Sequence, residues 1–460
     1  MGDTTIAALH DHVRGEVITP DDEHYEEART VHNGMIDRRP RAVVRCADVT
    51  DVRAVVRVAG EEGLDLAVRG GGHSVPGFGT ADDALVADLS AMTGVRVDPA
   101  ARTARIEGGG TWGDLDHTTH GFGLATTGGI ISTTGVGGLT LGGGIGHLVR
   151  GCGLSCDNLL SADVVTADGE LVTASEDQHP DLFWALRGGG GNFGVATSLE
   201  FRLHPVATIY GGPIFYPLEH ARHVLEFYDD FIAKAPEQLG AFFAFQIAPP
   251  LPFIPEDRHG ETMCAIVACW SGAVEEGEPA LAPMLEDAGP VVAHHVGPMP
   301  YPALNSAFDG LYPDGLQHYW KASFARELTP GAIEAHLEHG PRVPSVHSSM
   351  HIYPMDGAVD RVPADATAFA HRDARYAIVI AGMWPDAADN EANTRWVRDY
   401  YAATAPHSED GGYVNFMAGD DQHRIRANYG DNYDRLAAIK ETYDPNNLFH
   451  LNQNILPKTS

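Results

Sequence analysis

A histidine set among glycines is the most reactive-looking feature of the sequence, in Arg69-Gly-Gly-Gly-His-Ser74, which follows a strand-like stretch. Glycine permits positive φ angles, so successive backbone N–H groups of such a loop can surround an anion. Glycines continue at high density, with 23 among the 85 residues from 69 to 153. Backbone so free of side chains can approach a ligand from many sides, which predicts a large buried cofactor. A series of tight turns without a ligand is the alternative.

The glycine clusters do not match the common nucleotide-binding patterns. A dinucleotide-binding turn needs G-x-G-x-x-G directly after a strand, and the run from Gly135 to Thr140 lacks the last glycine. Residues 142–146 are rich in glycine, but no clear strand–helix–strand unit surrounds them. A P-loop needs a lysine in its turn, and the first lysine of the chain is Lys234. P-loop nucleotide hydrolysis is excluded, and NAD(P) binding of the Rossmann type is disfavoured.

A second group of polar and aromatic side chains lies in strand-like segments further along. Alternation over residues 317–323 puts His318 and Trp320 on one face and the residues between them on the other. His347 shares a face with two residues of the next strand, but metal binding there would need a third ligand that the sequence does not identify. We expect no metal, and we expect a substrate-pocket wall that contains Tyr319, Lys321, His351 and Tyr353. Surface positions and plain sheet packing are the alternatives.

The composition limits the partners of the protein. With 31 basic and 63 acidic residues the net charge is −32, and so acidic a surface repels phosphate backbones and anionic membranes. No apolar run approaches the ~20 residues of a membrane-spanning helix, and no secretory leader is visible at Met1. We expect a cytoplasmic protein without nucleic-acid or membrane partners, and reduced thiols at its five cysteines. Adaptation to high salt and a GC-rich genome both account for the scarcity of lysine.

Apolar periodicity predicts an α+β arrangement of short strands up to about residue 206. Residues 41–74 are expected to form a strand, a helix and a strand, with Thr50 as the N-cap of the helix and Gly63 as its stop. Further strands are expected over 95–106, 164–172 and 195–203.

The composition changes after Val206, where the glycine clusters stop and prolines become dense. This change predicts a second domain over 207–418, followed by a last segment that contains an amphipathic helix at 433–440. Within the second domain, helices are expected over 218–235 and 388–403, and strands over 319–324 and 376–381.

Six ordered motifs over about 400 residues resemble those of the berberine-bridge-enzyme-like oxidases, which belong to the vanillyl-alcohol-oxidase flavoprotein superfamily. They are the 69–74 loop with 88–90, then 135–146, 153–158, 181–194, 361–371, and the C-terminal group 429–433, 443–447 and 453–455. The resemblance implies an α+β, two-domain PCMH-type FAD-binding fold with an antiparallel-sheet substrate domain. The FAD domain would span 1–206, with a core of about 37–206, and 419–460 would return to it.

The resemblance implies FAD that is bound covalently through its 8α-methyl group to the imidazole of His73. Many family members add a bond from a cysteine to flavin C6, but Ile131 stands at that position, so a single bond is expected. Cys152 is near in sequence but off register. Noncovalent FAD beside a hydrogen-bonded His73 is the alternative. The other expected cofactor contacts are Arg69, Gly70, Gly71, Gly72, Ser74, Gly137, Gly138, Gly144, Asp157, Asn158, Val195, Asn452 and Asn454.

The reaction implied by the resemblance is hydride abstraction from a C–H beside an alcohol or amine of a small organic molecule, with dioxygen as acceptor and hydrogen peroxide as product. Thr134 would lie over the reactive face of the flavin and line the oxygen site. Tyr413 would be the catalytic base, provided that a neighbouring cation lowers its pKa from the usual ~10. Asn415 of the same segment is expected in the substrate pocket, and Phe416 replaces a tyrosine of the family pattern.

Two other kinds of function stay open at this stage. One is a dehydrogenase with a quinone or protein acceptor, or an oxygenating flavoenzyme of secondary metabolism. The other is a non-catalytic flavin-binding protein, for which Phe416 is the best support.

Overall fold

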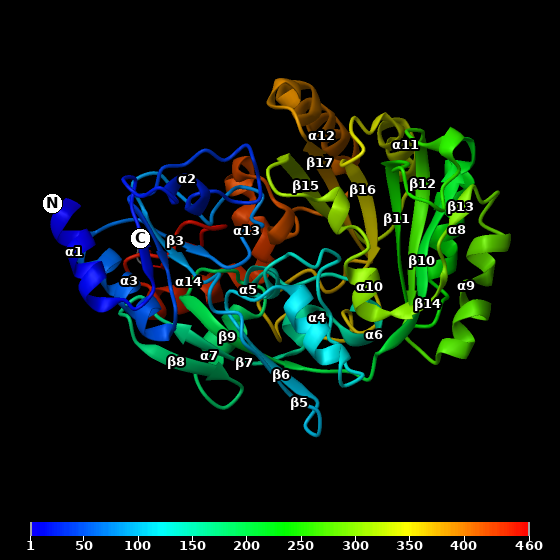
Figure 1. Ribbon diagram of the computed structural model, residues 1–460. Helices are drawn as coiled ribbons and strands as arrows, with labels where there is room; N and C mark the ends of the chain where they lie inside the picture. Colours follow the sequence, from blue (N-terminus) through cyan, green and yellow to red (C-terminus); the bar gives the residue numbers. More distant parts are fainter. Residues whose placement is uncertain (1, 459–460) are drawn as a thin grey trace.

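The protein is built around three β-sheets, two formed by the first half of the chain and one by the second. The computed structural model describes residues 2–458. In Figure 1 the two smaller sheets lie on the left, together with both ends of the chain, and the large sheet lies on the right.

The first sheet has four short strands in the order β1-β2-β4-β3, of which β2, β4 and β3 pair in parallel. Parallel neighbours need a crossover connection, and helix α3 (Val49–Glu62) follows β2. Asp48, rather than the predicted Thr50, caps this helix, because its carboxylate accepts hydrogen bonds from the backbone N–H groups of Thr50 and Asp51. Gly63 ends the helix with φ of 64°, as predicted. The strands are β1 (Glu16–Ile18), β2 (Ala42–Arg45), β3 (Leu66–Arg69) and β4 (Leu85–Asp88).

The second sheet has five antiparallel strands in the order β5-β6-β9-β7-β8. Its buried side chains pack against helices α4 (Trp112–His120), α5 (Val136–Leu141) and α7 (Pro180–Leu186). The strands are β5 (Val95–Asp98), β6 (Thr103–Glu107), β7 (Leu159–Val165), β8 (Leu171–Ser175) and β9 (Val195–Arg202).

The third sheet has eight strands in the order β13-β10-β12-β11-β16-β17-β15, with β14 also paired to β10. All of its pairings are antiparallel. The strands predicted at 319–324 and 376–381 are its members β15 and β17. The strands are β10 (Thr208–Pro217), β11 (Leu239–Ile247), β12 (Thr262–Trp270), β13 (Ala293–His294), β14 (Gly297–Pro300), β15 (Gln317–Ala325), β16 (Ser349–Pro354) and β17 (Tyr376–Trp384).

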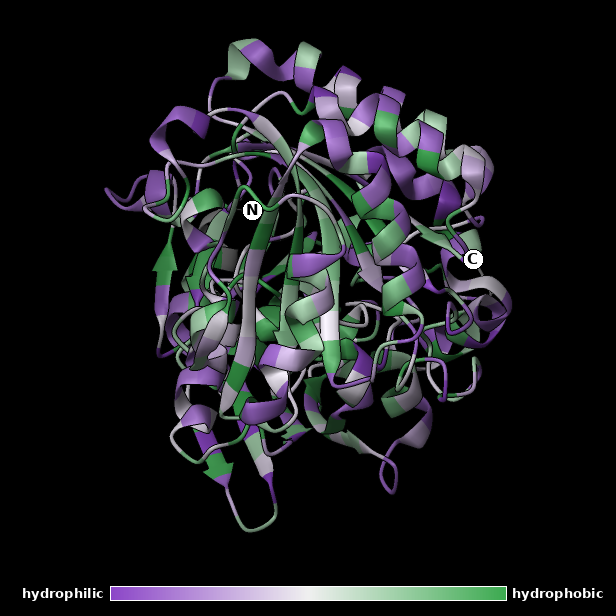
Figure 2. Ribbon diagram, turned by 90° about the vertical axis from the view of Figure 1, so that its right-hand side faces the viewer, coloured by the Kyte–Doolittle hydropathy of each residue, from purple (hydrophilic) through white to green (hydrophobic). Residues whose placement is uncertain are grey.

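Each face of the large sheet has its own core. Helices α8 (Ala221–Ile232), α9 (Gly277–Glu286), α11 (Pro330–His339) and α12 (Asn390–Thr404) bury one face, and Figure 2 shows these helices in front of strands that are mostly hydrophobic. The other face packs against Ile145, Leu148 and Val149 of the first half of the chain. The inner face of the sheet therefore looks toward the glycine-rich loops.

The C-terminal segment returns to the first half of the chain. Helices α13 (Ile425–Tyr429) and α14 (Tyr433–Tyr443) contribute buried side chains to the core of the second sheet. We propose on this basis the division expected from the sequence, with 1–206 and 419–460 as the cofactor domain and 207–418 as the substrate domain.

The remaining helices are short connections, except for the N-terminal one. Among residues 2–458, no helix has both the length and the apolar character that crossing a bilayer requires. The remaining helices are α1 (Gly2–His12), α2 (Tyr25–Ala28), α6 (Val149–Cys152) and α10 (Tyr301–Asn305).

Candidate cofactor and substrate site

A cavity of about 320 Å³ lies between the glycine-rich loops of the first half and the inner face of the large sheet. One wall is the loop after β3, residues 69–79. The opposite wall carries side chains of β15, β16 and β17, and residues 449–453 close a third side. Segments far apart in the chain thus enclose one elongated site.

Glycine makes the cavity possible in two ways. The loops at Gly71 and Gly135 touch backbone to backbone, because a Cβ at either position would overlap the backbone nitrogen of the other. At Gly138 and Gly191 a Cβ would meet no atom within 4 Å, and both residues line the cavity. Any side chain at these two positions would therefore project into space that a ligand needs. This cradle fits a large cofactor with an anionic part, as the glycine content predicts.

Arg69 lines the same wall, but its side chain is engaged with the protein. Its guanidinium donates to Asp88 Oδ2 at 2.8 Å and to the carbonyl oxygen of Thr30 at 3.0 Å. The backbone N–H of Leu89 also bonds to the carbonyl of Arg69. Arg69 therefore holds the start of the loop in place, and the buried carboxylate of Asp88 balances the charge of its guanidinium.

His73 lies at the centre of this wall with both ring nitrogens beside hydroxyl groups. Nε2 is 3.1 Å from Thr133 Oγ1, and Nδ1 is 3.4 Å from Thr134 Oγ1. Burial, with a smaller effect of the neighbouring His32, lowers the pKa of His73 to about 3, although Asp314 opposes the shift. The imidazole is consequently neutral at physiological pH and has a lone pair with which to react.

Several expected cofactor residues do line the cavity, whereas others do not. The expected positions that line it are Arg69, Gly70, Gly71, Gly72, His73, Ser74, Gly137, Gly138 and Asn452, together with Thr134, His351, Tyr353 and Asn415.

Five expected cofactor contacts need correction, and the side chains of two of them are bonded inside the protein. Asp157 binds Arg372 through both carboxylate oxygens, at 2.7 and 2.8 Å. Asn158 donates to the carbonyls of Cys152 and Leu154.

The other three lie outside the cavity lining. A Cβ on Gly144 would overlap the Ser155 side chain, so this glycine serves a close internal contact. Val195 is buried in the core of the first sheet, and its neighbours Gly194 and Ala196 line the cavity instead. Asn454 is likewise outside the lining, which ends at Gln453.

The structure also shows which residue stands where many family members form a second bond to the flavin. Ile131 lines the cavity and is buried. Cys152 does not line it, and burial raises the pKa of its thiol to about 12. A cysteine thiolate is therefore missing from this part of the described cavity wall.

The substrate end of the cavity is aromatic and carries no fixed charge. Among the described residues that line it, Arg69 is the one side chain with a permanent charge, and it lies at the cofactor end. Burial lowers the pKa of His318 and of His351 to about 3 each, so both rings are neutral. The lining residues at this end are Tyr312, His318, Trp320, His351, Tyr353, Val379, Ala381, Val414, Asn415 and Phe416.

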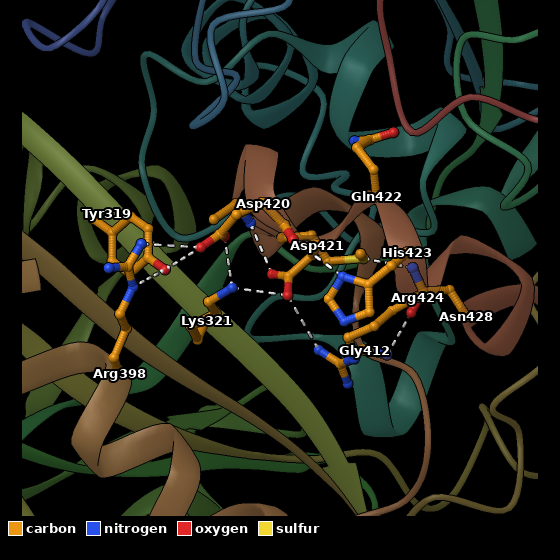
Figure 3. A network of polar contacts seen from close by, with 12 residues as sticks. Tyr319, Lys321, Arg398, Gly412, Asp420, Asp421, Gln422, His423, Arg424 and Asn428 are labelled. Carbon is orange, nitrogen blue, oxygen red and sulfur yellow. Dashed lines mark hydrogen bonds and ion pairs between the residues drawn. The ribbon is translucent and has the colours of Figure 1, made fainter. Parts of the chain in front are cut away.

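Tyr319 and Lys321 are on the wrong face of β15 for the pocket, which corrects the prediction. The Lys321 ammonium donates to Asp420 at 2.7 Å and to Asp421 at 2.8 Å, and Arg398 of α12 joins the same cluster (Figure 3). Tyr319 donates to Asp420 Oδ2 at 2.8 Å. This network ties residues 419–424 to the outer face of the large sheet, so both residues are structural.

Tyr413 is also displaced from its predicted role. It is 1% exposed, and its hydroxyl accepts hydrogen bonds from the backbone N–H of Gly144 at 2.7 Å and from Asn415 Nδ2 at 2.8 Å. Burial raises its pKa above the ordinary value, and it does not line the main cavity. Tyr413 buttresses the glycine loop and orients Asn415, and is not placed to act as a base.

The sequence did not assign Tyr312, His318 or Trp320 to the site. It also did not reveal the stacking of His32 on His73. The ring of His32 stacks on His73, and its Nδ1 lies 2.6 Å from Asp314 Oδ1. Alternation in β15 did separate His318 and Trp320 from their neighbours, and the face that carries them is the inward one. Tyr312 lies in a loop and had no sequence signal.

Comparison with known proteins agrees with this architecture. Residues 40–175 match the family model of the FAD binding domain, and residues 412–456 match the model described as berberine and berberine like. An FAD-linked oxidoreductase of Dictyostelium discoideum is 33% identical over 423 residues, which cover 91% of this chain and 89% of the relative. The (R)-6-hydroxynicotine oxidase of Paenarthrobacter nicotinovorans is 31% identical over 471 residues and covers 97% and 98%.

Solved structures show the same fold. The 6-hydroxy-D-nicotine oxidase of Arthrobacter nicotinovorans superposes with a TM-score of 0.86 at 29% identity, over 96% of this chain and 98% of the other. BBE-like 1 of Physcomitrella patens gives 0.87 at 22% identity, over 99% of each chain. The predicted α+β, two-domain PCMH-type fold is confirmed. The glycine cradle, the central histidine and these relatives identify the chain as a member of the berberine-bridge-enzyme-like family of FAD-linked oxidoreductases.

Proposed function

We propose that this protein is an oxidase whose FAD is attached through a single covalent bond to His73. The observation that carries the proposal is the neutral imidazole of His73, which lies in the middle of the glycine cradle with a pKa of about 3. An uncharged imidazole nitrogen is the form that can attack the 8α position of a flavin. Ile131 supports a single bond, because its side chain offers no nucleophile.

The chain's own residues have separate roles in this proposal. Gly138, Gly191 and the 69–74 loop admit the cofactor, and Asn452 closes the site by donating to the carbonyls of Phe449 and Gly191. FAD, when bound, supplies the acceptor for a hydride from a C–H beside an alcohol or amine. The aromatic end of the cavity excludes water and holds a small organic substrate.

Dioxygen is the proposed final acceptor, with hydrogen peroxide as product. Thr134 lines the cavity beside His73 and is the proposed wall of the oxygen site. Support also comes from the relatives, since one is named as an oxidase of 6-hydroxynicotine and two structural neighbours are named as oxidases of oligosaccharides. The substrates of those proteins are said of those proteins alone, and the uncharged, aromatic end of the present cavity supports a small organic substrate for this one.

Acid precipitation of the purified protein tests the attachment. We expect yellow colour in the pellet of the wild type and in that of His318→Ala, because His318 is another histidine of the same cavity. His73→Ala is expected to release all its flavin into the supernatant. Colour that stays with the His73→Ala pellet, or leaves the wild-type pellet, contradicts the proposal.

Peroxide production tests the acceptor. The holoenzyme is mixed with each compound of a panel of alcohols and amines in the absence of air, and air is then admitted. We expect one class to bleach the flavin and air to restore its colour with one hydrogen peroxide per turnover. Bleaching that only a dye or quinone reverses would identify a dehydrogenase instead.

A further inference from the structure

A row of proton-carrying side chains runs along one face of β16. Ser349, His351 and Tyr353 alternate on the inner face of this strand, and His347 precedes them in the turn that leads into it. The residues across from His351 on the neighbouring strands are Ala244 and Val379, which carry no polar side chain. The neighbours of His351 in the sheet are thus apolar, while Gln246 stands across from Ser349.

The inner end of the row is a direct contact inside the main cavity. Tyr353 Oη lies 2.7 Å from His351 Nδ1, and both residues line the cavity. The ring of Phe242 packs on both of them, with centroids 4.8 Å from His351 and 5.0 Å from Tyr353. This packing fixes the two rings in their hydrogen-bonding geometry.

The outer end of the row opens into a second, much smaller cavity. It has a volume of about 10 Å³, which is roughly the room of one water molecule. His351 lines both cavities, so its imidazole forms part of the partition between them. The small cavity is also lined by Ser349, Gln246 and His347, and His347 is partly exposed to solvent.

We propose that Tyr353, His351, Ser349 and His347 form a proton path, which carries the hydroxyl proton of the substrate from the main cavity to solvent. This inference rests on the proposed function. The substrate O–H bond breaks and its proton passes to Tyr353 Oη, while the original Tyr353 proton moves to His351 Nδ1. His351 then gives its Nε2 proton to a water of the small cavity, and from there the proton leaves past Ser349 and His347.

The electrons and atoms of the step balance with the proposed reaction. The electron pair of the adjacent C–H bond leaves with its hydrogen as hydride, for which FAD is the acceptor, and the substrate oxygen becomes a carbonyl. The path itself carries one proton outward and leaves His351 with its proton on Nδ1, so the ring must return to the Nε2–H tautomer before the next turnover. It needs no further oxidant or reductant.

Other groups of the cavity are poor alternatives. The described lining contains no carboxylate and no lysine, and Tyr413 is occupied by Gly144 and Asn415. His318 lines the main cavity but not the small one, whereas His351 lines both.

The chain contains a matched control for the inner pair. His336 Nδ1 lies 2.8 Å from Tyr400 Oη in the core behind the large sheet, where both residues are fully buried. Tyr400→Phe removes the same hydroxyl from the same kind of pair, at a position remote from the cavity. In anaerobic stopped-flow with an alcohol that the enzyme oxidises, we expect Tyr353→Phe to slow bleaching of the flavin by about 10²-fold. Tyr400→Phe should stay within twofold of the wild type.

Proton release tests the outer part of the path. An indicator dye reports the proton as it reaches solvent, while the flavin absorbance reports the reduction. We expect the two signals to coincide in the wild type, and the dye signal to lag at least threefold in Ser349→Ala and His347→Gln, with bleaching unchanged. Coincident signals in both variants would overturn this part of the path.

A binding measurement avoids turnover altogether. Phenol, as an uncharged hydroxyl probe, is titrated into holoenzyme labelled with ¹⁵N-histidine. We expect the ring nitrogen resonances of His351 to shift on binding and those of His336 to stay, with the His351 shift lost in Tyr353→Phe. An unmoved His351 signal overturns the path whether or not a substrate is found.

Different results contradict the proposed function and the proton path. A wild-type holoenzyme that no alcohol or amine bleaches contradicts the proposed function. A wild type that is bleached normally, with Tyr353→Phe within twofold of it, contradicts the proton path alone.

Discussion

The imidazole of His32 lies flat on that of His73, with ring centroids 4.0 Å apart and planes 13° from parallel. His32 is in turn paired with Asp314, which belongs to the loop before β15. The histidine proposed for flavin attachment is therefore stacked on a ring that is itself bonded to the second half of the protein. Its ring has little freedom to rotate away from the cavity.

The depressed pKa of His73 makes a prediction about pH. Because this pKa lies at about 3, the neutral imidazole persists as the pH falls through the ordinary histidine value of ~6.5. We expect apoprotein mixed with FAD to form acid-stable flavin at the same rate between about pH 5 and pH 8. The amount of flavin retained in acid pellets, sampled over time, measures this rate. A rate about thirtyfold lower at pH 5 than at pH 8 would indicate an ordinary histidine.

Thr134 makes a prediction about oxygen. Thr134→Leu adds bulk where the cavity borders His73, and we expect reoxidation of the reduced enzyme to slow by about tenfold, equivalent to about 1.4 kcal/mol. Thr134→Val keeps the shape and removes only the hydroxyl, so it separates access from hydrogen bonding. Stopped-flow mixing with aerated buffer measures both. An unchanged rate in the leucine variant argues against the oxygen site.

Gly138 makes a prediction about cofactor retention. A Cβ at this position meets no protein atom within 4 Å, so Gly138→Val should fold normally but fill part of the cradle. We expect the purified variant to contain less than about a tenth of the wild-type flavin. Gly297→Val is the matched control, because Gly297 also faces open space and lies outside the cavity. Full flavin content in Gly138→Val would show that the cofactor does not approach this glycine.

Lys321 makes a prediction about stability. Burial alone would lower its pKa, but hydrogen bonds to Asp420 and Asp421 reverse the shift and raise it. Lys321→Met leaves the buried Asp421 without its main partner, which is expected to lower the free energy of unfolding by about 3–5 kcal/mol. Lys234→Met breaks an exposed pair with Asp230 and should change it by less than about 1 kcal/mol. Urea unfolding followed by tryptophan fluorescence compares the two variants. Equal midpoints would contradict a stabilising role of the Lys321 ion pairs with Asp420 and Asp421.

Asp116 makes a prediction about how the stability of the protein changes with pH. Burial raises its pKa to about 7, although a hydrogen bond from Asn305 opposes the shift. A carboxyl with a raised folded pKa stabilises the protein at low pH and loses that contribution as the pH rises through the folded value. We expect Asp116→Asn to be more stable than the wild type at pH 8 by about 2–4 kcal/mol, and no more stable near pH 4.

The control for this pH dependence is Asp177→Asn, at an exposed position. We expect its unfolding midpoint to follow the wild type at both pH values. A stability gain of Asp116→Asn that is equal at pH 4 and pH 8 would show that the Asp116 carboxyl does not titrate between them.

The sequence predicted the cofactor wall better than the substrate wall, for a physical reason. The 69–74 loop is local, since glycine spacing and the preceding strand define its shape. Tyr319 and Lys321 were assigned to the wrong face because alternation separates two faces of a strand without saying which one is covered by helices. The decisive contact, with Asp420 and Asp421, comes from residues that lie about 100 positions further along the chain.

Tyr413 was misassigned for a related reason. The partner of its hydroxyl is the backbone of Gly144, 269 residues earlier, and no local pattern reveals that pairing. The spacing of His351 and Tyr353 did suggest a shared face, and their common cavity depends on the antiparallel pairing of β16 with β11 and β17. Long-range register is the part that local periodicity lacks.

The wall formed by residues 449–453 has a consequence for biosynthesis. These residues leave the ribosome after the glycine loops and the large sheet have been translated, so a nascent chain lacks one side of the compartment for most of its synthesis. Flavin loading is therefore expected to follow translation, and a polypeptide stalled before this segment should emerge colourless.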